Sequence, residues 1–213
     1  PASGFVAIYR EQPIVVGSVS SATMTYGDTP PTAFTFTDSG SGFVNGDSYG
    51  TPTAVGVNDA SNQSSVGFLN VKDGGYTVTL EDLDALGYNL DGVQTGTLTV
   101  NPLASVTWAG SAGDSWSDPT KWVWTDSPSR TDDVLPEGKN VTLALIPSTF
   151  SDTVVSTTAS NFAGKIKIEG GTLSVADDSH LGAVTSMAVA DRIILAGGTL
   201  EATAGFAMNA NRG

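Results

Sequence analysis

The chain has 213 residues, 25 of them glycine and 10 proline, with no cysteine, one histidine and a formal net charge of −13 at pH 7. The lack of cysteine excludes disulfides, thiolate metal sites and cysteine nucleophiles, and the acidic charge disfavours binding to nucleic acid or to anionic membrane surfaces. No apolar run approaches the roughly 18 residues of a membrane-spanning helix, and the first residues lack the pattern of a signal peptide. We therefore expect a piece of a longer protein.

Short stretches of alternating apolar and polar residues predict strands in the first half of the chain. Many of their residues are β-branched, and turn residues such as Gly27-Asp28 and Asp73-Gly74 separate them. The predicted strands are residues 14–19, 23–26, 33–37, 65–71, 76–80 and 96–100. Strands this short and this closely spaced predict a small antiparallel β domain over residues 14–102. Residues 1–13 are then a linker or the end of a preceding module, and residues 81–87 one or two helical turns.

Four motifs in this predicted β domain carry a resemblance to a known family. In chain order they are Thr25-Tyr26-Gly27-Asp28, Gly42-Phe43-Val44-Asn45-Gly46-Asp47, Gly75-Tyr76-Thr77-Val78 and Gly96-Thr97-Leu98-Thr99-Val100-Asn101-Pro102. Together they resemble the bacterial MBG domain of the YGx type, over residues 14–102. The resemblance implies a repeated module of large secreted or surface-anchored bacterial proteins. Its fold is expected to be an Ig-like sandwich or β-grasp-like.

An internal repeat lies in the second half. Residues 166–175 (IKIEGGTLSV) match residues 193–202 (IILAGGTLEA) in pattern, position for position. A repeat of about 20 to 50 residues, with a Gly-Gly corner between two short strands, predicts a solenoid whose copies bury their apolar faces by stacking. We expect the N-terminal part of a right-handed parallel β-helix, with its stacked turns over residues 141–213 and with Lys167, Ser174 and Glu201 pointing outward.

All four tryptophans also lie in the second half. Trp108-Ala109-Gly110, Trp116-Ser117-Asp118-Pro119 and Trp122 resemble the segment that opens the β-helix of autotransporter and filamentous-haemagglutinin-like passengers. Residues 197–200 and 209–213 look like the autotransporter-associated β-helix repeat. The resemblance implies an extracellular passenger in which the Trp-rich residues 103–140 cap the helix. Because Trp122-Val123-Trp124 is irregular, we expect one indole of this pair to face outward.

Few residues form a pattern for catalysis. Gly46-Asp47-Ser48-Tyr49-Gly50 fits the G-x-S-x-G nucleophile elbow, but no helical pattern follows it, so we interpret it as a polar turn. The single histidine lies in Asp177-Asp178-Ser179-His180, which we interpret as a solvated corner because one histidine without cysteine builds no zinc site. Paired acids such as Asp132-Asp133 leave a polysaccharide-cleaving enzyme open as a third alternative.

The motifs do not predict a metal site. Residues 82–87 begin like an EF-hand, but Leu86 and Val93 stand where the fifth and twelfth positions require oxygen ligands. The calcium-binding G-G-x-G-x-D repeat also fails, since Thr-Leu follows both Gly-Gly pairs. We therefore expect no cofactor, and we leave loose Ca²⁺ binding by loop carboxylates open.

These observations predict a structural or adhesive segment of a bacterial adhesin, at the cell surface or secreted, that extends and presents binding regions and is not an enzyme. Its expected partners are neighbouring modules of the same chain, with no nucleic acid and no membrane insertion. The alternative is a module that itself binds carbohydrate or a host protein, through Trp124, Trp122 or Tyr49 or through the segment at residues 49–65.

Overall fold

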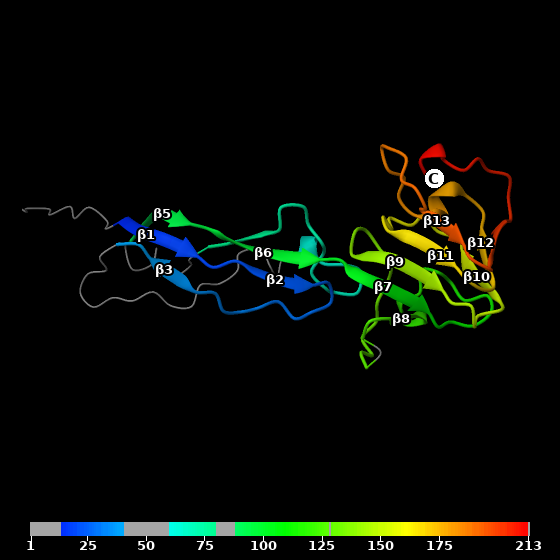
Figure 1. Ribbon diagram of the computed structural model, residues 1–213, viewed down its shortest axis with the longest axis horizontal. Helices are drawn as coiled ribbons and strands as arrows, with labels where there is room; N and C mark the ends of the chain where they lie inside the picture. Colours follow the sequence, from blue (N-terminus) through cyan, green and yellow to red (C-terminus); the bar gives the residue numbers. More distant parts are fainter. Residues whose placement is uncertain (1–13, 41–59, 80–87, 128, 213) are drawn as a thin grey trace, which may run out of the picture. The chain divides into compact units, whose positions relative to one another are not determined.

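The computed structural model describes residues 14–40, 60–79, 88–127 and 129–212, and within these ranges it is all-β, with only short 3-10 turns between the strands (Figure 1). The first-half strands are β1 (Ile14–Val19), β2 (Ala22–Thr25), β3 (Phe36–Asp38), β4 (Tyr76–Val78), β5 (Asn89–Gln94) and β6 (Gly96–Asn101). The second-half strands are β7 (Leu103–Trp108), β8 (Trp122–Trp124), β9 (Val141–Ile146), β10 (Thr153–Ser156), β11 (Lys165–Ile168), β12 (Thr172–Val175), β13 (Ile193–Leu195) and β14 (Thr199–Ala202). The 3-10 turns are η1 (Ala60–Asn62), η3 (Pro119–Lys121), η4 (Asp178–Leu181) and η5 (Ala210–Arg212).

The contacts divide the chain into two compact units that do not follow the sequence order. The first unit comprises Pro1–Thr23, Pro30–Val57 and Gly74–Thr99, and the second comprises Met24–Thr29, Asn58–Asp73 and Val100–Gly213. Two short segments of the first half therefore pack with the C-terminal half. The boundary predicted at residues 102 and 103 rests on motifs and not on contacts, and it stays a prediction.

The first unit is a mixed β structure. Strand β1 pairs antiparallel with β3 but parallel with β5, with a register shift between Ile14 and Val16. Strands β4 and β6 pair antiparallel, in a sheet of order β2-β6-β4. The expectation of a purely antiparallel domain is therefore wrong at β5. This strand was not predicted because Asn89, Asp91 and Gly92 interrupt any apolar alternation.

Five of the six predicted first-half strands correspond to observed ones. Alternate residues of β1 are buried, including Val15 and Val19, as period-2 alternation requires. The sixth prediction, residues 65–71, is wrong: this segment is irregular and makes one isolated bridge, between Gln63 and Leu69. Gly67, at a φ of +86°, turns the chain there and prevents a continuous strand. The helical turns predicted at residues 81–87 lie outside the described residues.

The second unit contains two sheets of parallel strands. One has the order β13-β11-β9-β7-β8, in which only β8 is antiparallel to its neighbour, and the other has the order β10-β12-β14 (Figure 1). Ile166 is paired with Ile193, and Thr172 with Thr199. These partners are equivalent positions of the internal repeat. The two copies therefore stack in register, as the sequence predicts.

The Gly-Gly corner between β11 and β12 is required by its surroundings. Gly171 has a φ of +58°, and a Cβ atom there would lie 2.5 Å from the carbonyl oxygen of Asp152. Both the positive φ and the close backbone approach exclude larger residues. The corner lets the chain turn from one parallel sheet into the other over a short distance.

Burial differs between the two copies of the repeat. Ile166, Ile168 and Leu173 are buried, whereas the side chain of Leu195, the register partner of Ile168, is 57% exposed. Lys167 is half-buried and pairs with Glu169 at 2.5 Å, and Glu201 is exposed. Ser174 was predicted to point outward but is only 6% exposed. It stands between Val155 and Glu201 in the register, and these longer side chains flank its small hydroxymethyl group.

Replacing Ile168 with alanine is expected to lower the free energy of unfolding by about 2–4 kcal/mol, because the side chain is fully buried and leaves a cavity. The matched control is Leu195→Ala, at the equivalent position of the second copy, which should cost less than about 0.5 kcal/mol. Denaturant unfolding followed by far-UV circular dichroism measures both. Equal losses in the two variants would contradict the difference in burial.

Candidate functional site

Three of the tryptophans form one packed cluster. Trp108, Trp116 and Trp122 are each at most 3% exposed, and the ring of Trp122 lies edge-on to both others, with centroid distances of 5.2 and 4.6 Å. The Trp122 Nε1 donates a hydrogen bond to the carbonyl oxygen of Trp116 at 2.9 Å. Such edge-to-face packing adds to the gain from burying the large indole surfaces. In this structure the three buried indoles therefore contribute to packing.

Neither indole of the Trp122–Trp124 pair faces solvent. Both are 2% exposed, whereas Val123 between them is 44% exposed. The expectation that one indole faces outward is wrong, because residues two apart in strand β8 share a face. Ligand contact through Trp122 or Trp124 stays a prediction, and it would require the indole to leave its buried position. Tyr49, the third proposed contact, lies outside the described residues.

Trp124 belongs to a second aromatic cluster, which we call the Arg130 cluster. It consists of Tyr26, Phe68, Trp124 and Arg130. The ring centroids are 5.6 Å apart for Tyr26 and Phe68 and 5.7 Å for Phe68 and Trp124. The Arg130 guanidinium lies 4.0 Å from the Trp124 ring centroid, which is within the range of a cation–π contact. Three segments distant in the sequence meet in this cluster.

The Tyr-Gly-Asp motif at residues 26–28 is built into the Arg130 cluster. Arg130 donates a hydrogen bond to the carbonyl oxygen of Gly27 and forms ion pairs with Asp28 at 3.6 Å and Asp132 at 3.4 Å. Gly27 has a φ of +90°, and a Cβ atom there would collide with the Trp124 ring. The motif therefore needs glycine for both its backbone conformation and its packing.

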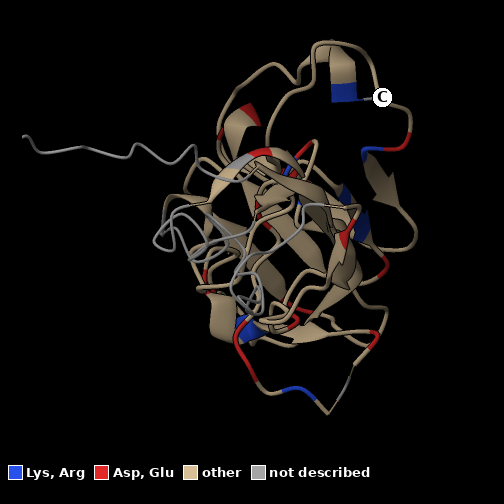
Figure 2. Cartoon of the chain, turned by 90° about the vertical axis from the view of Figure 1, so that its left-hand side faces the viewer, with Lys and Arg blue, Asp and Glu red and all other residues tan. Residues whose placement is uncertain are grey.

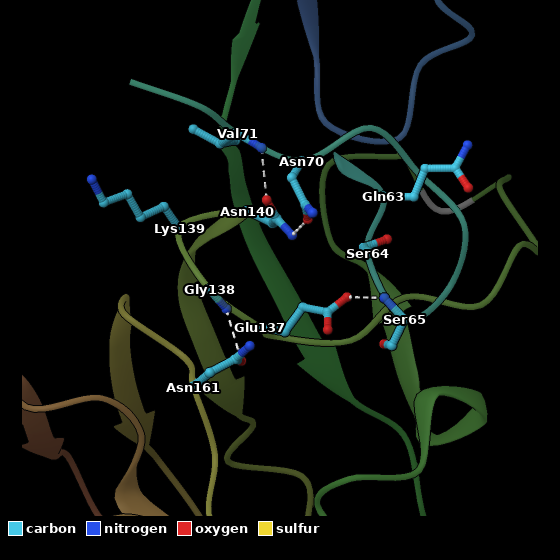
Figure 3. Close-up of a pocket in the computed structure, with 10 residues that line it drawn as sticks. All are labelled: Gln63, Ser64, Ser65, Asn70, Val71, Glu137, Gly138, Lys139, Asn140 and Asn161. Carbon is cyan, nitrogen blue, oxygen red and sulfur yellow. Dashed lines mark hydrogen bonds between the residues drawn. The ribbon is translucent and has the colours of Figure 1, made fainter. Parts of the chain in front are cut away.

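A polar cleft lies beside this cluster, and we call it the Glu137 cleft (Figure 3). Its volume is about 270 Å³. The lining residues come from two loops and one isolated position: Gln63, Ser64, Ser65, Asn70, Val71, Glu137, Gly138, Lys139, Asn140 and Asn161. Most of them carry amide or hydroxyl groups, which both donate and accept hydrogen bonds.

Hydrogen bonds between the two loops fix the walls of the Glu137 cleft. The Asn140 side chain accepts from the Val71 N–H at 2.8 Å and donates to Asn70 Oδ1 at 2.7 Å. Glu137 Oε1 accepts from the Ser65 N–H at 2.9 Å (Figure 3). Asn140 is 2% exposed, so its paired amide holds the loops together in a place where unpaired polar groups would be costly.

The hydroxyl of Tyr26 lies against the residues of this cleft. Tyr26 is fully buried, and its hydroxyl makes no hydrogen bond of good geometry with any described group. Burial raises its pKa to about 12; nearby Ser64 and Asn140 act to lower the pKa, and the Glu137 carboxylate acts to raise it. All three of these residues line the Glu137 cleft.

A second hollow adjoins the first, and we call it the Leu135 hollow. It also measures about 270 Å³ and shares Ser65, Glu137 and Asn161 with the Glu137 cleft. Its other lining residues include apolar ones and an indole: Trp116, Ser117, Leu135, Pro136, Thr158, Ala159 and Ser160. The Trp116 Nε1 is buried and has no hydrogen-bond partner in the described part of the chain.

The acidic corner around His180 is held by structural contacts. Asp177 accepts hydrogen bonds from the N–H and the hydroxyl of Ser179, at 2.9 and 2.6 Å. Asp178 pairs with the buried Arg212 at 2.7 Å. Hydrogen bonding to Arg212 is the main cause that lowers the pKa of Asp178 below its ordinary value of 3.8. Within the described ranges, no group of three or more His, Cys, Asp or Glu side chains could hold a metal ion.

Sequence reasoning missed two buried arginines. Arg192 and Arg212 are 4% and 2% exposed. The Arg192 guanidinium donates to the carbonyl oxygens of Phe162, Ala163 and Ala183, and Arg212 to those of Asp178, Leu181 and Gly182, in addition to its Asp178 ion pair. The planar fork of arginine suits several acceptors at once. No sequence pattern marked these positions, although the chain has few basic residues.

Comparison with known proteins supports the first half of the sequence interpretation. Residues 15–99 match the family model of the MBG domain (YGX type), which is less than half of the chain. MBG domains are found in bacterial surface proteins. No curated protein and no solved structure matches the chain. The predicted β-helix resemblance of residues 103–213 is not tested by these comparisons and stays a prediction.

Two further observations concern the positions of charged residues and the possibility of a membrane-spanning helix. Figure 2 shows the positions of Asp and Glu residues along the backbone, scattered over many loops, with fewer positions of Lys and Arg. No described helix has the length and apolar character needed to cross a membrane.

Replacing Arg130 with alanine is expected to lower the free energy of unfolding by about 1–3 kcal/mol, because Trp124 loses its cation–π contact and the Gly27 carbonyl loses its donor. The control is Lys139→Ala, which removes an exposed ion pair with Asp73 and should cost about 0–0.5 kcal/mol. Thermal unfolding followed by tryptophan fluorescence measures both. Equal stability of the two variants would rule out the role assigned to Arg130.

Replacing Arg212 with methionine is expected to lower the free energy of unfolding at pH 7 by about 3–5 kcal/mol, because Asp178 and the Leu181 and Gly182 carbonyls lose a buried partner. The pKa of Asp178 is lowered in the folded state, so its stabilisation is complete above about pH 5 and is lost as the pH falls through the folded pKa. The variant should lack this component of acid destabilisation. Parallel losses below about pH 4 in both proteins would contradict the assignment.

Proposed function

We propose that the chain is a structural, adhesive segment of a bacterial surface or secreted protein, whose role is to extend and present binding regions. The observation that carries the proposal is the MBG domain match over residues 15–99, because MBG domains are found in bacterial surface proteins. The absence of cysteine and the excess of acidic residues, 22 against 9 Lys and Arg, suit a soluble extracellular segment. The proposal includes no catalytic activity, and the partners are neighbouring modules of the same chain.

We further propose that residues 103–213 form the capped start of a right-handed parallel β-helix. The supporting observation is the stacking of the two repeat copies in register, in both parallel sheets. The cluster of Trp108, Trp116 and Trp122 would be its cap, since packed indoles next to the first strand of such a stack cover apolar surface that would otherwise be exposed. For the MBG-like part, an Ig-like or a β-grasp-like fold remains the proposal.

The surface role is tested on the bacterium that makes the full-length protein. An antibody raised against this segment should label intact cells, and added protease should remove the label while a cytoplasmic marker stays intact. Deleting the segment should lower the attachment of cells but leave the purified remainder able to bind its ligand, because a spacer changes the reach of a binding site and not its chemistry. Labelling only after lysis, or loss of ligand binding by the purified deletion protein, would overturn the proposal.

A further inference from the structure

The Glu137 cleft and the Leu135 hollow together form a site with the character of a ligand-binding surface. They share Ser65, Glu137 and Asn161, and each measures about 270 Å³. Each is therefore close to the lower end of the range of roughly 300–1,000 Å³ that small-molecule sites have. Each also has a buried polar group without a partner in the described residues, the Tyr26 hydroxyl beside the first and the Trp116 Nε1 beside the second.

The charged groups that line the Glu137 cleft favour neither a metal cation nor an anionic ligand. Glu137 is the only carboxylate among the described lining residues, whereas Ca²⁺ requires six to eight oxygen ligands. Lys139 is the only cation in the lining, and its ammonium group pairs with Asp73 and points away from the Glu137 carboxylate (Figure 3). An anionic ligand would therefore meet Glu137 without a free positive charge to compensate it.

The lining groups suit a ligand with many hydroxyls and some apolar surface. The amides of Gln63 and Asn161 and the hydroxyl of Ser65 can donate and accept, as sugar hydroxyls can. In the adjoining hollow, Leu135 and Ala159 offer apolar atoms to the C–H face of a sugar ring. A pyranose presents both kinds of surface within one ring.

We propose that the joined Glu137 cleft and Leu135 hollow bind a short neutral saccharide. One sugar residue occupies the cleft, where its hydroxyls donate to the free oxygen of Glu137 and accept from the Asn161 amide. Rotation of the Ser64 side chain lets this sugar residue reach the Tyr26 hydroxyl, which then forms a hydrogen bond with the sugar. The next residue lies over Leu135 and Ala159 in the adjoining hollow. This site is separate from the ligand contacts predicted at Trp122, Trp124 and Tyr49.

The test uses the full 213-residue chain and a panel of neutral glucose, galactose and mannose oligosaccharides, with polygalacturonate fragments as the charged counterpart. Binding is followed by shifts of the Asn70, Asn140 and Asn161 side-chain amides in ¹H–¹⁵N spectra. At least one neutral probe should shift these signals, whereas the charged fragments should not. No shift with any neutral probe at millimolar concentration, or shifts with the charged fragments alone, would overturn the proposal.

Three variants separate ligand contact from structural effects. Glu137→Gln and Tyr26→Phe should each weaken binding about two- to tenfold, the value expected for the loss of one hydrogen bond. Tyr76→Phe, the same chemical change in strand β4, should leave affinity unchanged. Tyr26→Phe should not lower the thermal midpoint of the free protein, since its hydroxyl has no partner there. Full affinity in both site variants would overturn the assignment of the site. The outcome does not depend on where the protein is located.

Discussion

The packing of Arg130 against Trp124 and Phe68 is the contact that holds the first-half segments of the second unit, and with them the polar cleft, against its C-terminal half. It joins the turn at Gly27, the loop at residues 63–73 and the segment after β8. A guanidinium over an indole gains a cation–π attraction and keeps its N–H groups free for the Gly27 carbonyl and the aspartates. Without this contact, the loop that carries Ser64 and Asn70 would be held only by its hydrogen bonds to Glu137 and Asn140.

Arginine side chains also join distant segments in the region of the stacked parallel strands. Parallel sheets leave loop carbonyls between successive turns, and burial makes unpaired carbonyls costly. Arg192 and Arg212 satisfy them by donating to carbonyls that come from different parts of the stack. A chain without cysteine cannot cross-link its loops covalently. In place of disulfides, buried arginines that donate hydrogen bonds to main-chain carbonyls hold the loops together.

The features of the fold that the sequence could predict are those that depend on periodicity. Alternation identified β1 and β4, and the 27-residue repeat predicted the register between β11 and β13, because both follow from side-chain spacing alone. Strand β5 and the irregular loop at residues 65–71 were missed since their structure depends on pairing partners and on Gly67. Long-range contacts leave no local signal in a single sequence.

The candidate site was not predicted from the sequence, because it too is formed by long-range contacts. Exposed aromatic residues and dense groups of acids are the sequence features that predict a binding site, but Trp124 is buried because residues two apart in β8 share a face. The cleft is instead made of amides and hydroxyls that are common in polar loops, brought together by Asn140 and by the Arg130 cluster. In a chain of net charge −13, the described lining of this cleft holds one carboxylate, Glu137, and one ammonium group, Lys139, so it is formally neutral. That contrast favours an uncharged, hydrogen-bonding ligand over ions of either sign.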